Sequence, residues 1–165
     1  MAEVLSGYRR PDGGVGFRNH VVLLSVVDTA NPVARRVAGF VRNTVPICPS
    51  FGRAQIADDY EQHVRTLAGL GSNPNVAAAV VLSLEPVAAR KVAERIARTG
   101  RPVEVVTFDE AGGSIRATEQ ATRAALHFVL EASGLQREPV PSTPSATPTC
   151  VGFNHDDGRA SLSKF

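Results

Sequence analysis

The chain has only two cysteines, Cys48 and Cys150, among its 165 residues, and no apolar run long enough to span a bilayer. Two cysteines this far apart do not form the disulfide framework typical of a small secreted domain. A membrane-spanning helix needs about 20 apolar residues in succession, and the N-terminus lacks the basic segment and long apolar stretch of a signal peptide. These absences predict a cytoplasmic protein with no membrane partner.

Lysine and net charge are also scarce. Lys91 and Lys164 are the only lysines, and the formal net charge is +2. Nucleic-acid binding usually needs a concentrated basic face, so the sequence argues against a nucleic-acid partner. The hydrophobic content of 43% and the charged content of 21% are values of a globular chain, long enough for one apolar core.

Several motifs of well-known enzyme classes are missing. The sequence has no P-loop, no nucleophile elbow and no Gly-x-Gly-x-x-Gly after a strand. The glycines between Asp12 and Gly16 precede a strand, which is the wrong context for a dinucleotide site. No histidines or cysteines have the close spacing of a metal motif, and a structural role is favoured for His63 and His127, which fall in amphipathic segments.

What the sequence does contain is a regular alternation of buried runs and amphipathic segments. Short runs rich in β-branched residues predict strands covered on both faces: residues 20–28, 45–48, 76–84 and 102–108. Apolar residues at helical spacing predict helices beginning near residues 33, 54, 86 and 115. This order predicts a three-layer α/β domain, Rossmann-like, with a mostly parallel sheet of about four strands. In such sheets ligands bind at the carboxyl edge, toward which the corner Asp28 to Pro32 points a helix N-terminus.

The predicted folded domain covers residues 1–135. A proline-rich linker is predicted over residues 136–149, because its prolines are interleaved with Ser and Thr and favour an extended chain. The tail, residues 150–165, is too short for a core of its own. It is therefore docked, inserted into a partner or disordered, and its apolar residues favour docking.

The stretch from Gly7 to His20 combines arginines with glycines and a proline just ahead of the first long strand. Glycine and proline predict a tight irregular loop. Cationic side chains on such a loop, with Arg10 and Arg18 among them, suit an anionic ligand or a partner surface. A solvated arm is the alternative. His20 stands where this loop enters the strand, so it is a candidate site residue.

Two further candidates follow predicted strands. The segment Asp109 to Ser114 opens the last helix, so its backbone N–H groups could receive an oxyanion, while Asp109 and Glu110 could bind a metal or act as a base. The alternative for both carboxylates is ordinary stabilisation of a helix N-terminus. Cys48 ends the second strand and is either an exposed nucleophile or metal ligand, or a small buried side chain, which is the commoner case.

Four segments spread over about residues 7–135 are distinctive: GYRRPDGGVGFRN, ARRVAG, RTLAGLGSNPNV and DEAGGS. Together they resemble the core domain of the altronate/galactarate dehydratase family, to which the sulfolactate sulfo-lyase large subunit also belongs. The resemblance implies a metal-dependent lyase that removes water from a hydroxylated sugar acid. Such an enzyme abstracts a proton next to a carboxylate and stabilises the enediolate on a divalent ion, which could be iron, manganese or magnesium.

The resemblance also assigns roles. Arg18 and Asn19 match the family's Arg-Asn pair, and Asp109 to Ser114 match its Gly-Gly loop. The predicted site therefore has three parts: the catalytic residues Asp109, Glu110 and His20, the substrate-binding residues Arg10, Arg18, Asn19, Gly112, Gly113 and Ser114, and the metal ligand Cys48.

The chain departs from the family pattern in three places. Cys48 to Arg53 replaces a His and a Gly-Cys-Gly segment, and Ser83 to Val87 replaces Gly-Leu-Gly-Cys-Glu. The family's large C-terminal portion has no counterpart in these 165 residues. Two hypotheses follow. One is a lyase subunit for a small anionic sugar acid, completed by a separate chain or a homo-oligomer. The other is a non-catalytic anion-binding or assembly module.

Overall fold

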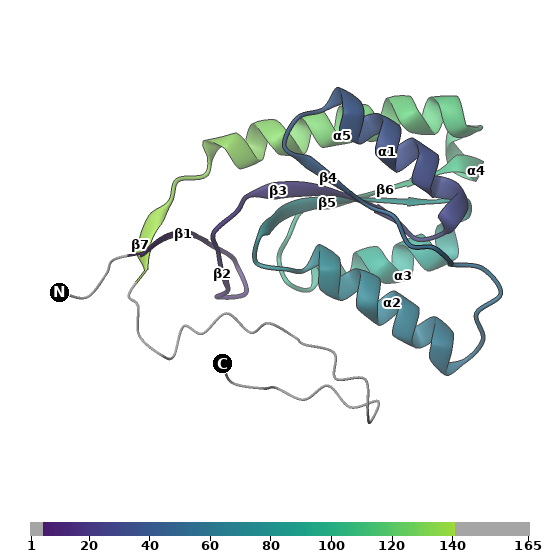
Figure 1. Ribbon diagram of the computed structural model, residues 1–165, viewed down its shortest axis with the longest axis horizontal. Helices are drawn as coiled ribbons and strands as arrows, with labels where there is room; N and C mark the ends of the chain where they lie inside the picture. The colour runs from purple at the N-terminus through teal and green to yellow at the C-terminus, as the bar shows by residue number, and fades with distance from the viewer. Residues whose placement is uncertain (1–4, 141–165) are drawn as a thin grey trace.

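The computed structural model describes residues 5–140, and its centre is a four-stranded parallel sheet (Figure 1). The strands lie in the order β4-β3-β5-β6. Their bounds are β3 (His20–Ser25), β4 (Thr44–Ile47), β5 (Val76–Ser83) and β6 (Val103–Thr107). The predicted Rossmann-like α/β fold with a parallel sheet of about four strands is confirmed.

Helices cover both faces of this sheet. They are α1 (Asn31–Phe40), which follows the 3-10 turn η1 (Asp28–Ala30), then α2 (Asp58–Gly71), α3 (Pro86–Ala97), α4 (Phe108–Ala111) and α5 (Ser114–Gly134). Helices α1 and α5 pack together on one face, and α2 and α3 pack together on the other (Figure 1). Within residues 5–140, no helix is long and apolar enough to cross a membrane.

The strand order places the first strand of the sheet in its interior. All eight residues of β5 are buried, and β3 beside it is buried from Val21 to Ser25. Continuous burial explains why these strands have apolar runs instead of an alternating pattern. Helix α5 lies close over them because it presents small residues to the core, among them Ala117, Ala121 and Ala125, all fully buried.

A second, antiparallel sheet lies at one end of the first, in the order β2-β1-β7 (Figure 1). Its strands are β1 (Leu5–Arg9), β2 (Val15–Gly16) and β7 (Glu138–Val140). The prediction of an irregular loop from residue 7 to residue 20 is therefore wrong, because β1 and β2 form a hairpin. Its turn is closed by hydrogen bonds from the Arg10 N–H to the Gly14 carbonyl at 2.8 Å and from the Gly13 N–H to the Arg10 carbonyl at 2.9 Å.

Strand β7 comes from the segment that the sequence assigns to the linker. Pro139 is tolerated there because β7 is an edge strand, where no second ladder needs its missing N–H. Residues 138–140 are thus part of the fold. Residues 141–149 of the predicted linker and the predicted tail, residues 150–165, lie outside the described residues.

Two buried arginines attach the hairpin to the main sheet. Arg101 donates from Nη1 to Asp12 Oδ2 at 2.7 Å and from Nε to the Val76 carbonyl at 3.3 Å. Arg10 donates from Nε to the Pro74 carbonyl at 2.7 Å and from Nη2 to the Arg18 carbonyl at 3.0 Å. Since these acceptors lie on the hairpin and at the amino edge of the main sheet, the arginines fix the two sheets relative to each other.

The hairpin packs closely against the backbone before β5 at Gly16. A Cβ atom at this position would overlap the carbonyl group of Pro74, which is backbone and cannot turn away. We expect Gly16→Ala to lower the free energy of unfolding by about 1–3 kcal/mol in urea denaturation. The control is Gly39→Ala in α1, where nothing lies within 4 Å of the added atom. It should raise stability by roughly 0.5–1 kcal/mol, and equal effects of the two substitutions would contradict the packing described.

Asp12 makes the attachment pH-dependent. Burial raises the pKa of its carboxyl, but hydrogen bonds from Arg101 and from the Gly14 N–H, with the charge of Arg101, outweigh burial and hold the pKa below its usual value. A lowered folded-state pKa stabilises the fold above the unfolded-state pKa of about 3.9, and this contribution is lost as pH falls through the folded-state value. We expect Asp12→Asn to cost about 1–3 kcal/mol at pH 7, and the cost should shrink below about pH 4.

The measurement is urea unfolding of the wild type and of Asp12→Asn between pH 7 and pH 3. Glu104→Gln is the matched control, since Glu104 is exposed on β6 and forms no ion pair within residues 5–140. A difference between wild type and Asp12→Asn that stays constant across this pH range would show that the ion pair with Arg101 does not stabilise the fold.

Candidate functional site

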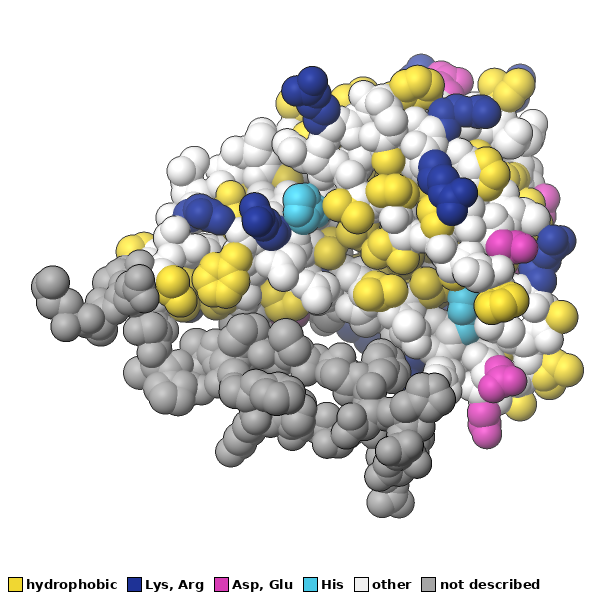
Figure 2. Space-filling model, viewed as in Figure 1, with side chains coloured by type: hydrophobic (Ala, Val, Ile, Leu, Met, Phe, Trp, Pro, Cys, Tyr) yellow, Lys and Arg dark blue, Asp and Glu magenta, His cyan; other side chains and the backbone are white. Residues whose placement is uncertain are grey.

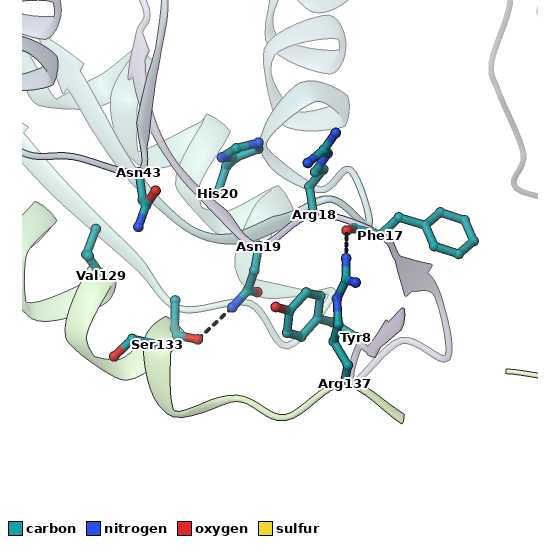
Figure 3. A pocket seen from close by; sticks show the side chains of 10 residues that line it. Tyr8, Phe17, Arg18, Asn19, His20, Asn43, Val129, Ser133 and Arg137 are labelled. Atoms are coloured by element: carbon teal, nitrogen blue, oxygen red, sulfur yellow. Dashed lines mark hydrogen bonds between the residues drawn. The ribbon is translucent and has the colours of Figure 1, made fainter. Parts of the chain in front are cut away.

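A cavity of about 280 Å³ lies at the amino edge of the main sheet, beside the start of β3. It is enclosed by the end of the hairpin, the α1–β4 turn and the C-terminal end of α5 (Figure 3). We call it the amino-edge cavity. Its polar wall is formed mainly by Tyr8, Arg18, Asn19, His20, Asn43 and Arg137. The structure therefore brings together three predicted site residues, Arg18, Asn19 and His20.

The turn before β5 positions this part of the chain. The side chain of Asn75 accepts hydrogen bonds at Oδ1 from the backbone N–H groups of Phe17, at 2.9 Å, and of Arg18, at 3.0 Å. The backbone carbonyl of Asn75 accepts a third bond from the His20 N–H at 3.0 Å. Because one residue fixes three backbone N–H groups between Phe17 and His20, the side chains of Arg18 and His20 leave the chain in set directions at the cavity.

Arg18 and Asn19 differ in how many hydrogen bonds their side chains form within the described residues. The Arg18 side chain is exposed, and within residues 5–140 its guanidinium makes no hydrogen bond or ion pair. Asn19 donates from Nδ2 to the Ala132 carbonyl at 2.6 Å, while its Oδ1 is buried and has no partner among the described residues (Figure 3). A cationic donor and an unsatisfied acceptor thus adjoin each other.

Arg137 closes the cavity from the chain that follows α5. It donates from Nη2 to the Phe17 carbonyl at 2.6 Å, and its guanidinium lies 5.4 Å from the centroid of the Tyr8 ring (Figure 3). The guanidinium of Arg10 lies 5.6 Å from the same ring. Such cation–π contacts hold the arginines near the tyrosine without neutralising their charge.

The amino-edge cavity is electropositive. Its described lining includes Arg18, Arg137 and His20, and contains no Asp or Glu. In the face shown in Figure 2, basic side chains and a histidine lie toward the end with β1 and β7, and the visible acidic side chains lie toward the opposite end, where basic side chains and a histidine are also seen. An anion with hydroxyl groups fits this combination of guanidinium, imidazole and amide groups.

The predicted catalytic carboxylates lie elsewhere. Asp109 and Glu110 are in α4, which follows the carboxyl end of β6, whereas His20 is at the amino end of β3 (Figure 1). His20 pairs with Val76 at the start of β5, and Thr107 pairs with Ser83 at its end. Val76 and Ser83 are seven residues apart along β5, so at about 3.3 Å per residue His20 and Thr107 are separated by about 23 Å along the strand direction. Within one chain, His20 and the two carboxylates therefore do not share a site.

Polar groups of the acidic Gly-Gly segment, Asp109 to Ser114, form hydrogen bonds and an ion pair with neighbouring parts of the fold. Glu110 accepts a hydrogen bond from Thr107 Oγ1 at 2.8 Å and pairs with Arg90. The N–H groups of Gly112 and Gly113 donate to the carbonyls of Asp109, at 3.3 Å, and Phe108, at 2.8 Å. The expectation that these two N–H groups are free for an oxyanion is wrong. The glycines are needed because both have positive φ, 78° and 119°, and Ser114 then begins α5.

The predicted metal ligand Cys48 does not lie in a cluster of other possible metal ligands within the described residues. It follows β4 at the carboxyl edge, and its only polar contact within the described residues is at 3.9 Å, from Sγ to the Asn31 carbonyl. Strands β4 and β6 are opposite edges of the sheet, so Cys48 is also remote from Asp109. Across residues 5–140 no three His, Cys, Asp or Glu side chains gather. The donor set of this part of the chain therefore does not fit a divalent metal.

The sequence missed three residues of this cavity, and one predicted site residue lies outside it. Tyr8, Asn43 and Arg137 line the cavity, but none had a local signal, and Arg137 falls in the predicted linker. Arg10, predicted to bind substrate, is 6% exposed and does not line the amino-edge cavity. Because Arg10 donates to the Arg18 carbonyl, it positions the neighbouring wall instead.

Comparison with known proteins finds similarity to parts of a sulfo-lyase subunit and of a dehydratase. The chain is 44% identical over 133 residues to the (2R)-sulfolactate sulfo-lyase subunit beta of Chromohalobacter salexigens, a match covering 81% of this chain and 34% of that protein. It is 31% identical over 88 residues to the altronate dehydratase of Bacillus subtilis, covering 47% of this chain and 18% of that protein. The chain thus spans about a third of the length of the first relative. No solved structure matches it.

The family match agrees with the described fold. Residues 7–133 match the family described as D-galactarate dehydratase/Altronate hydrolase, second domain. This range begins in β1, ends with α5 and includes Arg18, Asn19 and His20 of the amino-edge cavity. The family that the four sequence segments resembled is confirmed, and the chain belongs to the second-domain family of the D-galactarate dehydratases and altronate hydrolases.

Proposed function

We propose that this chain is a lyase subunit that binds the carboxylate of a hydroxylated acid in its amino-edge cavity and depends on a partner chain to complete the reaction. One observation carries the proposal: the described cavity wall gathers Arg18, His20 and Arg137 and contains no carboxylate. The relatives' lyase names support the reaction class, and the small anionic sugar acid expected from the sequence is the substrate class proposed.

Three residues of the cavity wall offer different chemical groups to a substrate. Arg18 offers a planar guanidinium, which binds a carboxylate through two parallel hydrogen bonds. Asn19 offers its unsatisfied Oδ1 as an acceptor for a substrate hydroxyl. His20 carries the one imidazole in the described wall, the side chain that most often serves as a general acid or base, so we assign proton transfer to it.

The remaining parts of the reaction are assigned outside this chain's cavity. Abstraction of a proton next to a carboxylate needs stabilisation of the resulting enediolate, which a divalent ion supplies in metal-dependent lyases. We place that ion, whether iron, manganese or magnesium, on residues outside 5–140, because the described donors do not gather. The first relative is a subunit and about three times as long as the matched segment, which supports a partner chain.

A second candidate function is an anion-binding or assembly module without catalysis. It is favoured by the position of the acidic Gly-Gly segment, where Glu110, Gly112 and Gly113 are all bonded within the fold. The position of His20 at the opposite end of the sheet from Asp109 and Glu110, about 23 Å away along the strands, also favours it. One chain then offers groups that bind the anion but lacks a complete set of acid and base groups at that site.

Binding of the carboxylate is tested by Arg18→Ala. We expect purified protein to bind D-galactarate, altronate or sulfolactate in calorimetric titrations, and Arg18→Ala to weaken the binding at least tenfold, because a charge-assisted hydrogen bond contributes about 1.5–3 kcal/mol. Arg36→Ala is the matched control, since Arg36 is equally exposed but lies on α1 away from the cavity. Equal losses in the two variants, or no loss in either, would contradict the assigned site.

Lyase activity is tested by adding the missing portion. We expect 2-keto acid formation from one of the three acids only when this chain is combined with a chain carrying the rest of the family's sequence and a divalent ion. Arg18→Ala should reduce the rate in that mixture by at least tenfold, and His20→Ala likewise. Retained carboxylate binding without product in any combination would leave the non-catalytic module as the function.

A further inference from the structure

A second cavity, of about 390 Å³, lies under the C-terminal half of α5, between the hairpin turn and the α3–β6 turn. Its wall is mostly apolar and includes Ala77, Ala78, Phe128 and Leu135. Two buried arginines, Arg10 and Arg101, interrupt this apolar wall, and a third arginine in it, the exposed Arg9, pairs with Glu138. We call it the arginine cavity. Its volume is within the range of small-molecule sites, which combine apolar walls with a few fixed polar groups.

Both arginines are buried. Arg10 is 6% exposed and Arg101 is 3% exposed. Arg101 uses Nη1 and Nε for bonds to Asp12 and Val76, and its Nη2 is buried without any hydrogen-bond partner. Arg10 uses Nε and Nη2 for backbone carbonyls, and within residues 5–140 its Nη1 makes no hydrogen bond. A buried donor without a partner, as Arg101 Nη2 is among the described residues, is costly, so an acceptor at this place would be stabilising.

Of the two buried arginines of the arginine cavity, only Arg101 has a carboxylate partner within the described residues. Arg101 is neutralised by Asp12, whereas Arg10 has only uncharged carbonyl acceptors. Glu131 also lines the cavity, but its side chain is 54% exposed and lies 3.6 Å from His127. Burial and the neighbouring Arg101 both lower the pKa of Arg10, as expected for two cations that share one carboxylate. Among the described residues, the buried guanidinium of Arg10 therefore has no carboxylate in direct contact.

We propose that the arginine cavity is a binding site for a small monocarboxylate with a compact apolar body, its carboxylate seated against Arg10 and Arg101 and its apolar part against Phe128 and the two alanines. One carboxylate matches the one buried guanidinium that has no carboxylate partner among the described residues. A dianion such as phosphate would bring a second charge and no apolar surface to an apolar wall. This site does not depend on the proposed lyase function, because Arg18 and His20 do not line it.

The probe is benzoate, titrated into the full-length chain at pH 7 and followed by calorimetry and by amide chemical shifts. We expect saturable binding, with shift changes at Ala77, Ala78 and Gly100 and not at Asn43, which lines only the amino-edge cavity. Benzamide, which has the same shape without the charge, should bind at least tenfold more weakly, and so should inorganic phosphate. Equal binding of benzoate and benzamide, or of benzoate and phosphate, would overturn the ligand class.

A variant at the rim tests the location without disturbing the buried arginines. Leu135→Glu places a competing carboxylate at the cavity, at a position already 48% exposed, and should weaken benzoate binding at least tenfold. Leu130→Glu is the matched control, because Leu130 is 72% exposed on α5 and lines neither cavity. Arg18→Ala should also leave benzoate binding unchanged. Absence of saturable benzoate binding, or equal affinity in Leu135→Glu and wild type, would overturn the proposal.

Discussion

The attachment of the N-terminal hairpin to the amino edge of the main sheet depends on buried arginines. Arg101 binds Asp12 of the hairpin turn, and Arg10 binds the backbone before β5 and at Arg18. Guanidinium groups suit this role because several N–H donors diverge from one rigid plane, so one side chain can fix segments far apart in sequence. Both cavities have walls built from this junction, so the binding surfaces of the chain exist only because the hairpin is held in place.

The location of these cavities departs from the usual arrangement of doubly wound sheets, in which ligands bind at the carboxyl edge where the strand order reverses. Here that edge is covered by the segment after β4. Gly52 packs directly against the backbone of Val26 and Val27, and Asn31 donates to the Pro49 carbonyl at 2.8 Å. With the carboxyl edge between β3 and β4 packed in this way, the two cavities lie at the amino edge instead.

The separation of the two edges has a consequence for catalysis. A lyase needs an anion site and acid–base groups within reach of one substrate, and binding groups alone do not supply the chemistry. In the proposed function, the amino-edge cavity would supply the first requirement through Arg18, and His20 would supply one proton-transfer group. Asp109 and Glu110 serve the α4–α5 junction on the far side of the sheet. A chain that spans about a third of its relative is consistent with a subunit whose reaction is completed by other residues.

The sequence by itself determined the elements of the main sheet and the family. Strand and helix patterns are local, so β3, β5 and α5 could be placed from their apolar periodicity, and the GYRRPDGGVGFRN segment marked the family. Only the tertiary structure decided which candidates meet. The pairing of β1 with β7 joins residues some 130 positions apart and brings Arg137 to Tyr8, which no local pattern encodes. The same folding separated His20 from Asp109, because parallel strands send their two ends to opposite edges.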